Sequence, residues 1–306
     1  MKGLRPDLFA GIVPFVRVAE EKSFARAAAS LGLTTAAVSK AVRKLEDDMG
    51  AIAAVEEVMA AAMATGAPLH VVHVPSMALG QTEKALDLIY RAQKRGFDIT
   101  CDFYPYTAFG TGIASEVFSG DWEKKFGMTY KDLEWAKTHE RLTPETFAKY
   151  RAEGGFVIAH CIPEAAVRAA AAHPASVVGS DGHLDEDGTG HPRSSGTFAR
   201  VLGHYCRDQK VLSLRDALGK MTYRTAKRFE KRCPDFKRKG RVQVGCDADL
   251  VAFDLATVSD IATFDQPGLH SVGFHHVLVH GRFAIQDGQL DKNGRFGKPL
   301  RAPVTR

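Results

Sequence analysis

The run SVVGSDGH over residues 176–183 places a carboxylate directly after a short apolar stretch. The β-branched pair Val177 and Val178 predicts a buried strand over residues 176–180. A carboxylate at the carboxyl end of a barrel strand can bind a metal ion and take a proton from bound water. Asp181 is therefore a candidate catalytic residue and metal ligand, although Ser-Asp-Gly is also a common surface turn.

Three further residues lie at or beyond the ends of predicted strands, where they can contribute to the same site. Arg193 follows in the loop after Asp181, and a guanidinium group suits two-pronged binding of a carboxylate. His73 comes at the end of a predicted strand over residues 68–74, and Tyr106 follows another over residues 97–103. A histidine and an aspartate at nearby strand ends can share a zinc ion.

The other histidines divide into two groups. A lone histidine on a strand is more often a hydrogen-bonded core residue than a ligand, and this interpretation is applied to His70, His160, His173 and His204. His183 and His191 fall in a loop, where either role is open.

Strands and helices alternate through the middle of the chain. Helices are expected over residues 51–65, 82–95 and 163–173, strands over 68–74, 97–103, 156–161 and 176–180, and a helical, polar insertion over 115–153. Such alternation predicts a parallel sheet with right-handed crossovers. These strands would make half of an eight-stranded barrel.

The first 50 residues form a separate helical pattern. Helices are expected over residues 8–20, 24–31 and 35–49, with Ser23 and Thr34 as N-caps and Gly32 ending the second helix. This is the spacing of a helix-turn-helix. Hydroxyl groups at the start of the third helix and cations along one face suit a DNA major groove and its phosphates.

The run SFARAAASLGLTTAAVSKAVRKLE over residues 23–46 closely resembles the DNA-reading head of LysR-type transcriptional regulators. The resemblance covers nearly all of residues 7–50. It implies DNA-facing side chains at Thr34, Thr35, Ser39, Lys40 and Arg43. The chain departs from that family at Ala36, where proline is usual, and after Gly50, where no wing or dimerising linker helix follows. The alternative is a three-helix cap with an incidental basic face.

A second resemblance rests on the motifs DITCDFYPYT (98–107), GSDG (179–182), HPRSSGTFARVLG (191–203) and LSLRDALGKMT (212–222). Together they resemble the amidohydrolase superfamily, and most closely its N-acyl-D-amino-acid deacylases, over roughly residues 51–290. The resemblance implies zinc bound by His73 and Asp181, with Asp181 also the general acid and base. Arg193 and Tyr106 would hold the substrate carboxylate and polarise the scissile amide.

The chain also departs from this second family. The opening His-x-His ligands, a bridging cysteine or lysine and a further histidine are absent, and Pro75 stands where a substrate-contacting lysine is expected. Catalytic zinc normally takes three protein ligands. Two remaining ligands predict weak zinc binding and weak or absent hydrolysis.

The last part of the chain, residues 233–306, predicts strands and a hairpin that turns near His280-Gly281. In the resembled family this is half of a small β-sandwich. Without the other half its strands have open edges, which can pair with a second copy in a homo-oligomer.

The composition is that of a globular protein: 45% of the 306 residues are hydrophobic and 25% charged, with a net charge of +5. The five cysteines form no CxxC pair, no apolar run suits a membrane span, and no signal peptide is apparent, so a cytoplasmic location is expected.

The sequence thus predicts an α/β protein in three parts. These are a LysR-like helix-turn-helix (1–50), an incomplete (β/α) amidohydrolase barrel (51–232) and a partial β-sandwich with a tail (233–306). The leading hypothesis is a weak or inactive hydrolase of N-acyl-D-amino acids. The alternatives are a DNA-binding regulator that senses a carboxylate ligand, and a recombination product without an evolved function.

Overall fold

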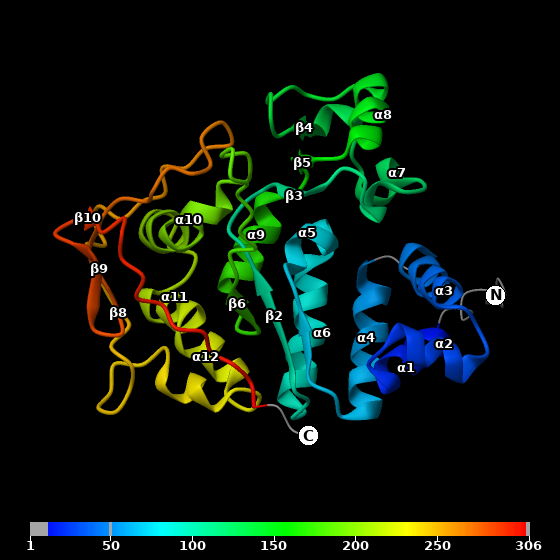
Figure 1. The fold of residues 1–306 in the computed structure, drawn as a ribbon, viewed down its shortest axis with the longest axis horizontal. Coiled ribbons are helices and arrows are strands. Elements are labelled where there is room, and N and C mark those ends of the chain that lie inside the picture. Colours follow the sequence, from blue (N-terminus) through cyan, green and yellow to red (C-terminus); the bar gives the residue numbers. More distant parts are fainter. Residues whose placement is uncertain (1–11, 49–50, 304–306) are drawn as a thin grey trace. The chain divides into compact units, whose positions relative to one another are not determined.

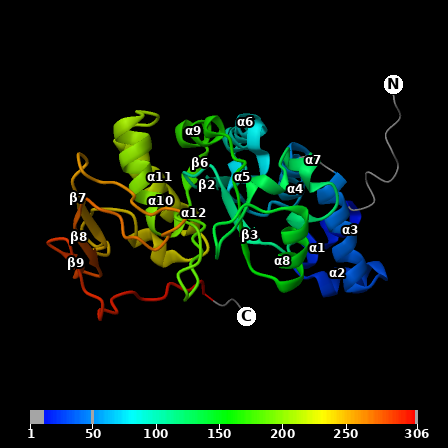
Figure 2. The ribbon, with the colours of Figure 1, turned by 90° about the horizontal axis from the view of Figure 1, so that it is seen from above.

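The computed structural model describes residues 12–48 and 51–303, and the side chains of 13–42 and 51–303 (Figures 1 and 2). These residues form two compact units. One contains residues up to Val71 together with Lys84–Thr100, and the other contains Val72–Glu83 and the chain from Cys101 onward. The chain passes from one unit to the other within a strand, β2.

The first unit begins with helices α1 (Ile12–Glu21), α2 (Phe24–Leu31), α3 (Thr35–Asp48) and α4 (Ala51–Thr65). The predicted caps are confirmed: Ser23 Oγ accepts from the Arg26 N–H, Thr34 Oγ1 accepts from the Ala37 N–H, and Gly32 ends α2 with a φ of 65°. Each cap satisfies a helix-terminal group that has no partner within the helix. The helical prediction for residues 8–11 and Met49 lies outside the described residues.

A three-stranded sheet with the order β1-β2-β6 carries the residues of interest. Its strands are β1 (Leu69–Val71), β2 (Ile99–Phe103) and β6 (Ser176–Val178), and helices α6 (Thr82–Lys94) and α9 (Glu164–Ala172) lie between them in the chain. β2 and β6 are parallel, with Cys101 opposite Ser176. The predicted parallel α/β arrangement is therefore confirmed for these strands.

Two strand boundaries were predicted too long. β1 ends at Val71, because His73 adopts a φ of 37° and Pro75 lies in the first turn of helix α5 (Val74–Ala78). A left-handed residue cannot continue a strand, and proline favours the start of a helix. β6 ends at Val178, which leaves Asp181 three residues beyond the strand, also in the left-handed region with a φ of 48°.

The strand predicted over residues 156–161 does not belong to the parallel sheet, so that part of the prediction is wrong. β5 (Phe156–Ala159) pairs antiparallel with both β3 (Phe109–Gly112) and β4 (Leu133–Trp135) in a separate sheet. A short apolar run has the same pattern in either kind of sheet, so periodicity does not distinguish them. The insertion supplies a small aromatic core, in which Trp122 of α7 (Trp122–Phe126) stacks on Phe147 of α8 (Pro144–Glu153).

Helices α10 (Arg193–Arg200), α11 (Leu214–Met221) and α12 (Tyr223–Phe229) follow β6, with a π-helical stretch over Val201–Asp208. Lys220 of α11 is 1% exposed and donates hydrogen bonds to the backbone oxygen and Oγ of Ser176, at 3.0 and 2.8 Å. This contact fastens α11 to the first residue of β6. Single 3-10 turns lie at Leu79–Gln81, Glu116–Phe118, Tyr130–Asp132 and Pro234–Arg238.

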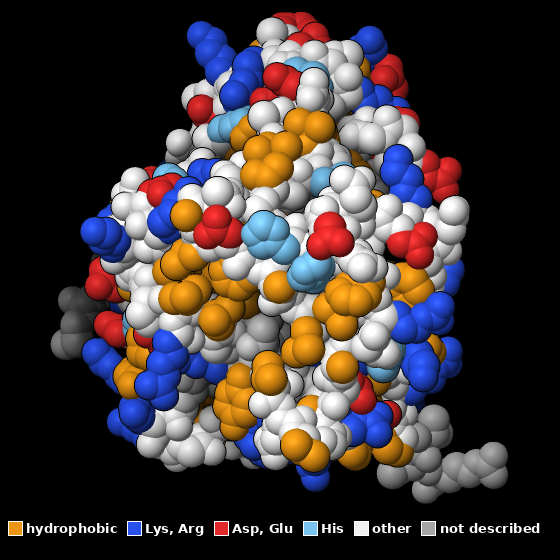
Figure 3. Space-filling view, turned by 90° about the vertical axis from the view of Figure 1, so that its left-hand side faces the viewer, with side chains coloured by type: hydrophobic (Ala, Val, Ile, Leu, Met, Phe, Trp, Pro, Cys, Tyr) orange, Lys and Arg blue, Asp and Glu red, His pale blue; other side chains and the backbone are white. Residues whose placement is uncertain are grey.

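The carboxyl-terminal part forms an antiparallel sheet with the order β10-β9-β8-β7. Its strands are β7 (Leu250–Phe253), β8 (Phe274–Val279), β9 (Arg282–Gln286) and β10 (Gln289–Leu290). His280 and Gly281 both have positive φ, as a two-residue hairpin turn requires, and confirm the predicted turn. Figure 3 shows the face on this side of the molecule, where apolar, histidine and charged side chains are intermixed.

Candidate active site

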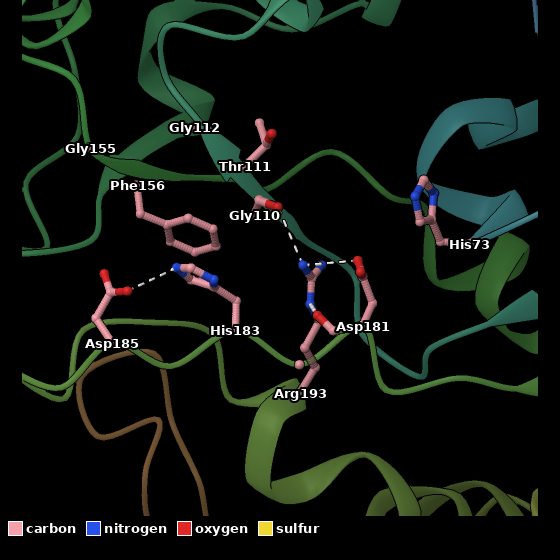
Figure 4. A pocket seen from close by; sticks show the side chains of 11 residues that line it. His73, Gly110, Thr111, Gly112, Gly155, Phe156, Asp181, His183, Asp185 and Arg193 are labelled. Carbon is pink, nitrogen blue, oxygen red and sulfur yellow. Dashed lines mark hydrogen bonds and ion pairs between the residues drawn. The ribbon is translucent and has the colours of Figure 1, made fainter. Parts of the chain in front are cut away.

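A pocket of about 580 Å³ lies within the second unit (Figure 4). Its charged lining residues are Asp181, Asp185 and Arg193, beside two histidines, His73 and His183. The remaining lining residues are Gly110, Thr111, Gly112, Gly155, Phe156 and Gly182. The structure therefore brings three of the predicted site residues, His73, Asp181 and Arg193, to one cavity.

Arg193 and Asp181 form an ion pair in this pocket. Arg193 Nη2 lies 2.9 Å from Asp181 Oδ2, and Arg193 Nε donates to the backbone oxygen of Asp181 at 2.6 Å. The arginine side chain is 3% exposed, whereas that of Asp181 is 46% exposed. Arg193 Nη1 is buried and has no hydrogen-bond partner within the described residues. A buried, unpaired guanidinium nitrogen is costly unless a ligand supplies an acceptor.

His191 and Tyr104 hold Arg193 in place. The fully buried His191 pairs its Nε2 with the Ala108 carbonyl at 3.0 Å and accepts the Arg193 N–H on Nδ1 at 3.0 Å. Burial, and then the nearby Arg193 charge, hold the pKa of His191 well below its usual value, so the ring is neutral with its proton on Nε2. The Arg193 guanidinium lies 4.6 Å from the centre of the Tyr104 ring, which adds a cation–π contact.

His73 is held in the pocket lining by Ser76 and Asp102. Ser76 Oγ donates to the His73 carbonyl and also lies 2.7 Å from His73 Nδ1. These two contacts fix the orientation of the imidazole ring in the pocket lining. The carboxylate of Asp102 accepts a hydrogen bond from the His73 N–H. This bond supports a backbone conformation that a histidine rarely adopts.

Tyr106 lies outside the pocket lining. It is 5% exposed, and its hydroxyl is 3.3 Å from both the Pro192 carbonyl and Asp260 Oδ2. Burial, followed by the nearby Asp260 charge, raises the pKa of Tyr106. In this arrangement it anchors the segment around Asp260 beside α10, and its expected contact with substrate stays a prediction.

The far end of the pocket is formed by residues that the sequence interpretation left undecided or did not consider. His183 stacks face to face on Phe156, with ring centres 4.4 Å apart, and its Nε2 lies 3.3 Å from Asp185 Oδ1 (Figure 4). Asp102 is the one charged residue of strand β2, and this was the available signal for the support of His73. No comparable signal marked Phe156 or Asp185.

The zinc ion implied by the resemblance does not fit the residues present. Among the residues that the structure describes, no group of three or more His, Cys, Asp or Glu side chains is placed to hold a metal ion. His73 and Asp181 line one pocket, but the Asp181 carboxylate is engaged by Arg193. Two candidate ligands are fewer than a catalytic zinc site requires.

The predicted DNA-facing residues lie on or just before α3. Thr34, Thr35 and Lys40 are exposed and Ser39 is half-buried, while the side chain of Arg43 lies outside the described residues. The Thr34 hydroxyl is already engaged as the cap of α3.

The chain belongs to the amidohydrolase family, whose sequence model matches residues 10–285. This range includes α2 and α3, the segment that resembles LysR-type regulators. The presence of a fused LysR-type head remains a prediction.

Among curated relatives, the chain is 35% identical over 245 residues to an N-acyl-D-glutamate deacylase of Alcaligenes xylosoxydans xylosoxydans, covering 75% of this chain and 48% of the relative. A D-aminoacylase of the same organism is 34% identical over 246 residues, with the same coverage. The chain spans about half the length of these relatives. The resemblance to the deacylase branch is thus supported.

Solved structures agree with this assignment. The N-acyl-D-glutamate deacylase of Bordetella bronchiseptica, complexed with zinc and a phosphonate inhibitor, is 32% identical with a TM-score of 0.68, covering 83% of this chain and 54% of that one. A D-aminoacylase structure is 31% identical with a TM-score of 0.63, covering 78% and 51%. These likenesses support an α/β fold.

Proposed function

We propose that the pocket binds the carboxylate of an N-acyl-D-amino acid through Arg193, and that hydrolysis of the amide by this chain is slow or absent. The observation that carries the binding proposal is the buried Arg193 Nη1, which lacks a partner among the described residues. Its neighbour Nη2 is occupied by Asp181, so a ligand carboxylate would share the guanidinium with Asp181. The deacylase relatives support the choice of ligand class.

The proposal for weak hydrolysis rests on the residues around Asp181. As general base, Asp181 would have to take a proton from water and return it to the leaving amine. Here its carboxylate is paired with Arg193 at 2.9 Å, so the group that would have to contact the water molecule is already engaged by a guanidinium. A zinc ion would supply an activated water molecule in an amidohydrolase, but the residues present do not fit such an ion.

Calorimetric titration tests the binding proposal. N-acetyl-D-alanine carries the carboxylate, and N-acetyl-D-alaninamide is the matched ligand without the charge. A charge-assisted hydrogen bond contributes about 1.5–3 kcal/mol, so the carboxylate should bind at least tenfold tighter. Equal affinity for the two ligands contradicts the proposal. The Arg193→Gln variant should lose the preference, while its melting temperature reports separately on folding.

A hydrolysis assay tests the second half of the proposal. The purified chain is incubated with zinc and N-acetyl-D-amino acids, and amine release is followed. We expect little or no turnover. Robust turnover that disappears in Asp181→Asn contradicts the proposal and restores Asp181 as the general acid and base.

A second candidate function, DNA binding, is favoured by one observation. α2 and α3 are joined by a tight turn at Gly32, and Thr35 and Lys40 are exposed on α3. A gel shift that weakens with salt and with Lys40→Ala and Arg43→Ala would support this function. Binding that is insensitive to both substitutions argues against it.

We also propose that residues 51–232 are part of an amidohydrolase barrel and that residues 233–306 contain part of a β-sandwich, with β7 and β10 as the two outer strands of its sheet. Unpaired strand edges favour association with another chain. Size-exclusion chromatography with light scattering measures the oligomeric state directly, and a monomer at all concentrations contradicts homo-oligomer formation through these edges.

A further inference from the structure

The pocket is bordered by the free edge of a strand. In the sheet of order β3-β5-β4, β3 is an outer strand, and its residues Gly110, Thr111 and Gly112 line the pocket. One edge of β3 is paired with β5. The N–H and C=O groups on the other edge can therefore form hydrogen bonds with a ligand in the pocket. The identity of those groups follows from the pairing pattern.

Alternate residues of an antiparallel strand point their N–H and C=O groups toward the partner strand. The Ile113 N–H donates to the Gly155 carbonyl at 2.9 Å, and Thr111 lies opposite Val157 in the same register. Ile113 and Thr111 therefore face β5, whereas Gly110 and Gly112 face outward. In agreement, the Gly110 carbonyl accepts a hydrogen bond from Arg193 Nη2 (Figure 4).

Two N–H donors lie on this outer edge. The Gly112 carbonyl accepts from the Ser115 N–H at 3.0 Å, and the register places the N–H groups of Gly110 and Gly112 on the side of β3 that is not paired with β5. Both residues lack side chains, so a ligand can approach the backbone closely. Two residues along a strand correspond to about 6.7 Å, which is the spacing these two donors present.

We propose that the pocket takes an N-acylated dipeptide, bound as an added strand antiparallel to β3, in preference to a single N-acyl amino acid. The inference rests on the proposed function, since the ligand carboxylate is placed at Arg193 and the Gly110 N–H. The acyl carbonyl then accepts from the Gly112 N–H. Strand addition of this kind combines main-chain hydrogen bonds with side-chain pockets.

The length of the ligand follows from the direction of its carbonyl groups. In an extended chain, carbonyls two residues apart lie on the same edge, and neighbouring carbonyls lie on opposite edges. An N-acyl dipeptide presents its carboxylate and acyl carbonyl on one edge, whereas a single N-acyl amino acid cannot. An acyl group also has no N–H, which matches the occupied Gly112 carbonyl. The N–H of the terminal residue would share the Gly110 carbonyl with Arg193 Nη2, since a carbonyl oxygen has two lone pairs.

The size of the pocket agrees with a ligand of this length. At about 580 Å³ it falls within the range of roughly 300–1,000 Å³ that holds drug-sized molecules. The stacked rings of Phe156 and His183 form a wall at the end away from His73 (Figure 4). The acylated end of the dipeptide would lie along this wall.

Substitutions at Gly112 test the contribution of its N–H donor independently of the other pocket residues. Gly112→Pro removes the N–H, and proline is tolerated on an edge strand where that group faces outward. Gly112→Ala keeps the N–H and is the matched control, because an added Cβ meets only the Gly155 oxygen, at 3.9 Å. Both variants are compared with the unaltered chain by calorimetry, using N-acetyl-D-alanyl-D-alanine and N-acetyl-D-alanine with a chelator present.

The unaltered chain and Gly112→Ala should bind the dipeptide about fivefold to tenfold tighter than the single amino acid, which corresponds to one added hydrogen bond. Gly112→Pro should bind both ligands equally. The inference is overturned if the unaltered chain binds the dipeptide and the single amino acid equally, or if Gly112→Pro still prefers the dipeptide. Either result leaves the proposed carboxylate binding intact. If neither carboxylate binds, the proposed function fails and the inference fails with it.

Discussion

The buried lysine of α11 makes the stability of this protein depend on pH in a way that the structure specifies. Lys220 contacts the backbone and hydroxyl oxygens of Ser176 and is 1% exposed. Burial, reinforced by the charge of Arg224, lowers the pKa of Lys220 to about 8 from an ordinary value of 10.5. Between these two values the unfolded chain still binds a proton that the folded chain has released.

Because the unfolded state binds more protons in this interval, the free energy of unfolding rises with pH. A shift of one pKa unit corresponds to about 1.4 kcal/mol. For folded and unfolded pKa values of about 8 and 10.5, the gain between pH 7 and pH 10 is about 2.5 kcal/mol. The free energy of unfolding therefore rises from pH 7 onward, and the rise is complete above the pKa of Lys220 in the unfolded chain.

Urea denaturation at pH 7, 8, 9 and 10 measures this gain when the unaltered chain is compared with Lys220→Met. Methionine fills a similar volume without a titrating group, so the other groups that titrate at high pH cancel in the difference. The stability of the unaltered chain relative to the variant should increase by about 2.5 kcal/mol over this range. A difference that stays constant from pH 7 to pH 10 refutes the reasoning, because the lysine would then keep its proton when folded.

Three further predictions concern the supports of the pocket. Asp102→Ala should lower stability by about 1.5–3 kcal/mol, because the His73 N–H loses a charged acceptor, and Asp102→Asn should cost less; thermal melting of both variants checks this. Gly110→Ala should lower the free energy of unfolding by about 1–3 kcal/mol, because the added Cβ would lie 2.3 Å from the Phe156 ring. A melting temperature equal to that of Gly112→Ala would contradict this prediction. Burial would raise the pKa of Glu134, but hydrogen bonds from His160 and His139 outweigh burial and hold this pKa below its usual value. The stability that the ionised carboxylate contributes is therefore lost as the pH falls through the lowered pKa. Glu134→Gln should flatten this loss in acid denaturation below pH 5.

The elements that sequence alone predicted well are those with local chemical signals. Ser23, Gly32 and Thr34 mark helix ends because caps satisfy backbone groups within one turn, and His280-Gly281 marks a hairpin because both residues accept positive φ. The parallel orientation of β2 and β6 agrees with the alternation of strands and helices, although that pattern did not predict that these two strands are neighbours.

Features that depend on distant partners were not predictable in this way. β5 joins β3 and β4, which lie far from it in the chain, and no period in residues 156–159 reveals these partners. The motifs identified Asp181 and Arg193 as site residues, but not that they pair with each other. That pairing depends on the left-handed backbone at Asp181 and on the burial of His191.

The ion pair of Asp181 and Arg193 is encoded within a single loop of the chain, residues 179–193. The proposed recognition of an acid would therefore depend on this loop, on the strand edge beside it and on the Tyr104 ring that contacts Arg193. A metal centre, in contrast, must gather ligands from strands spread around an entire barrel. Under the proposed function, a chain that keeps this loop can select a ligand whether or not it can cleave one.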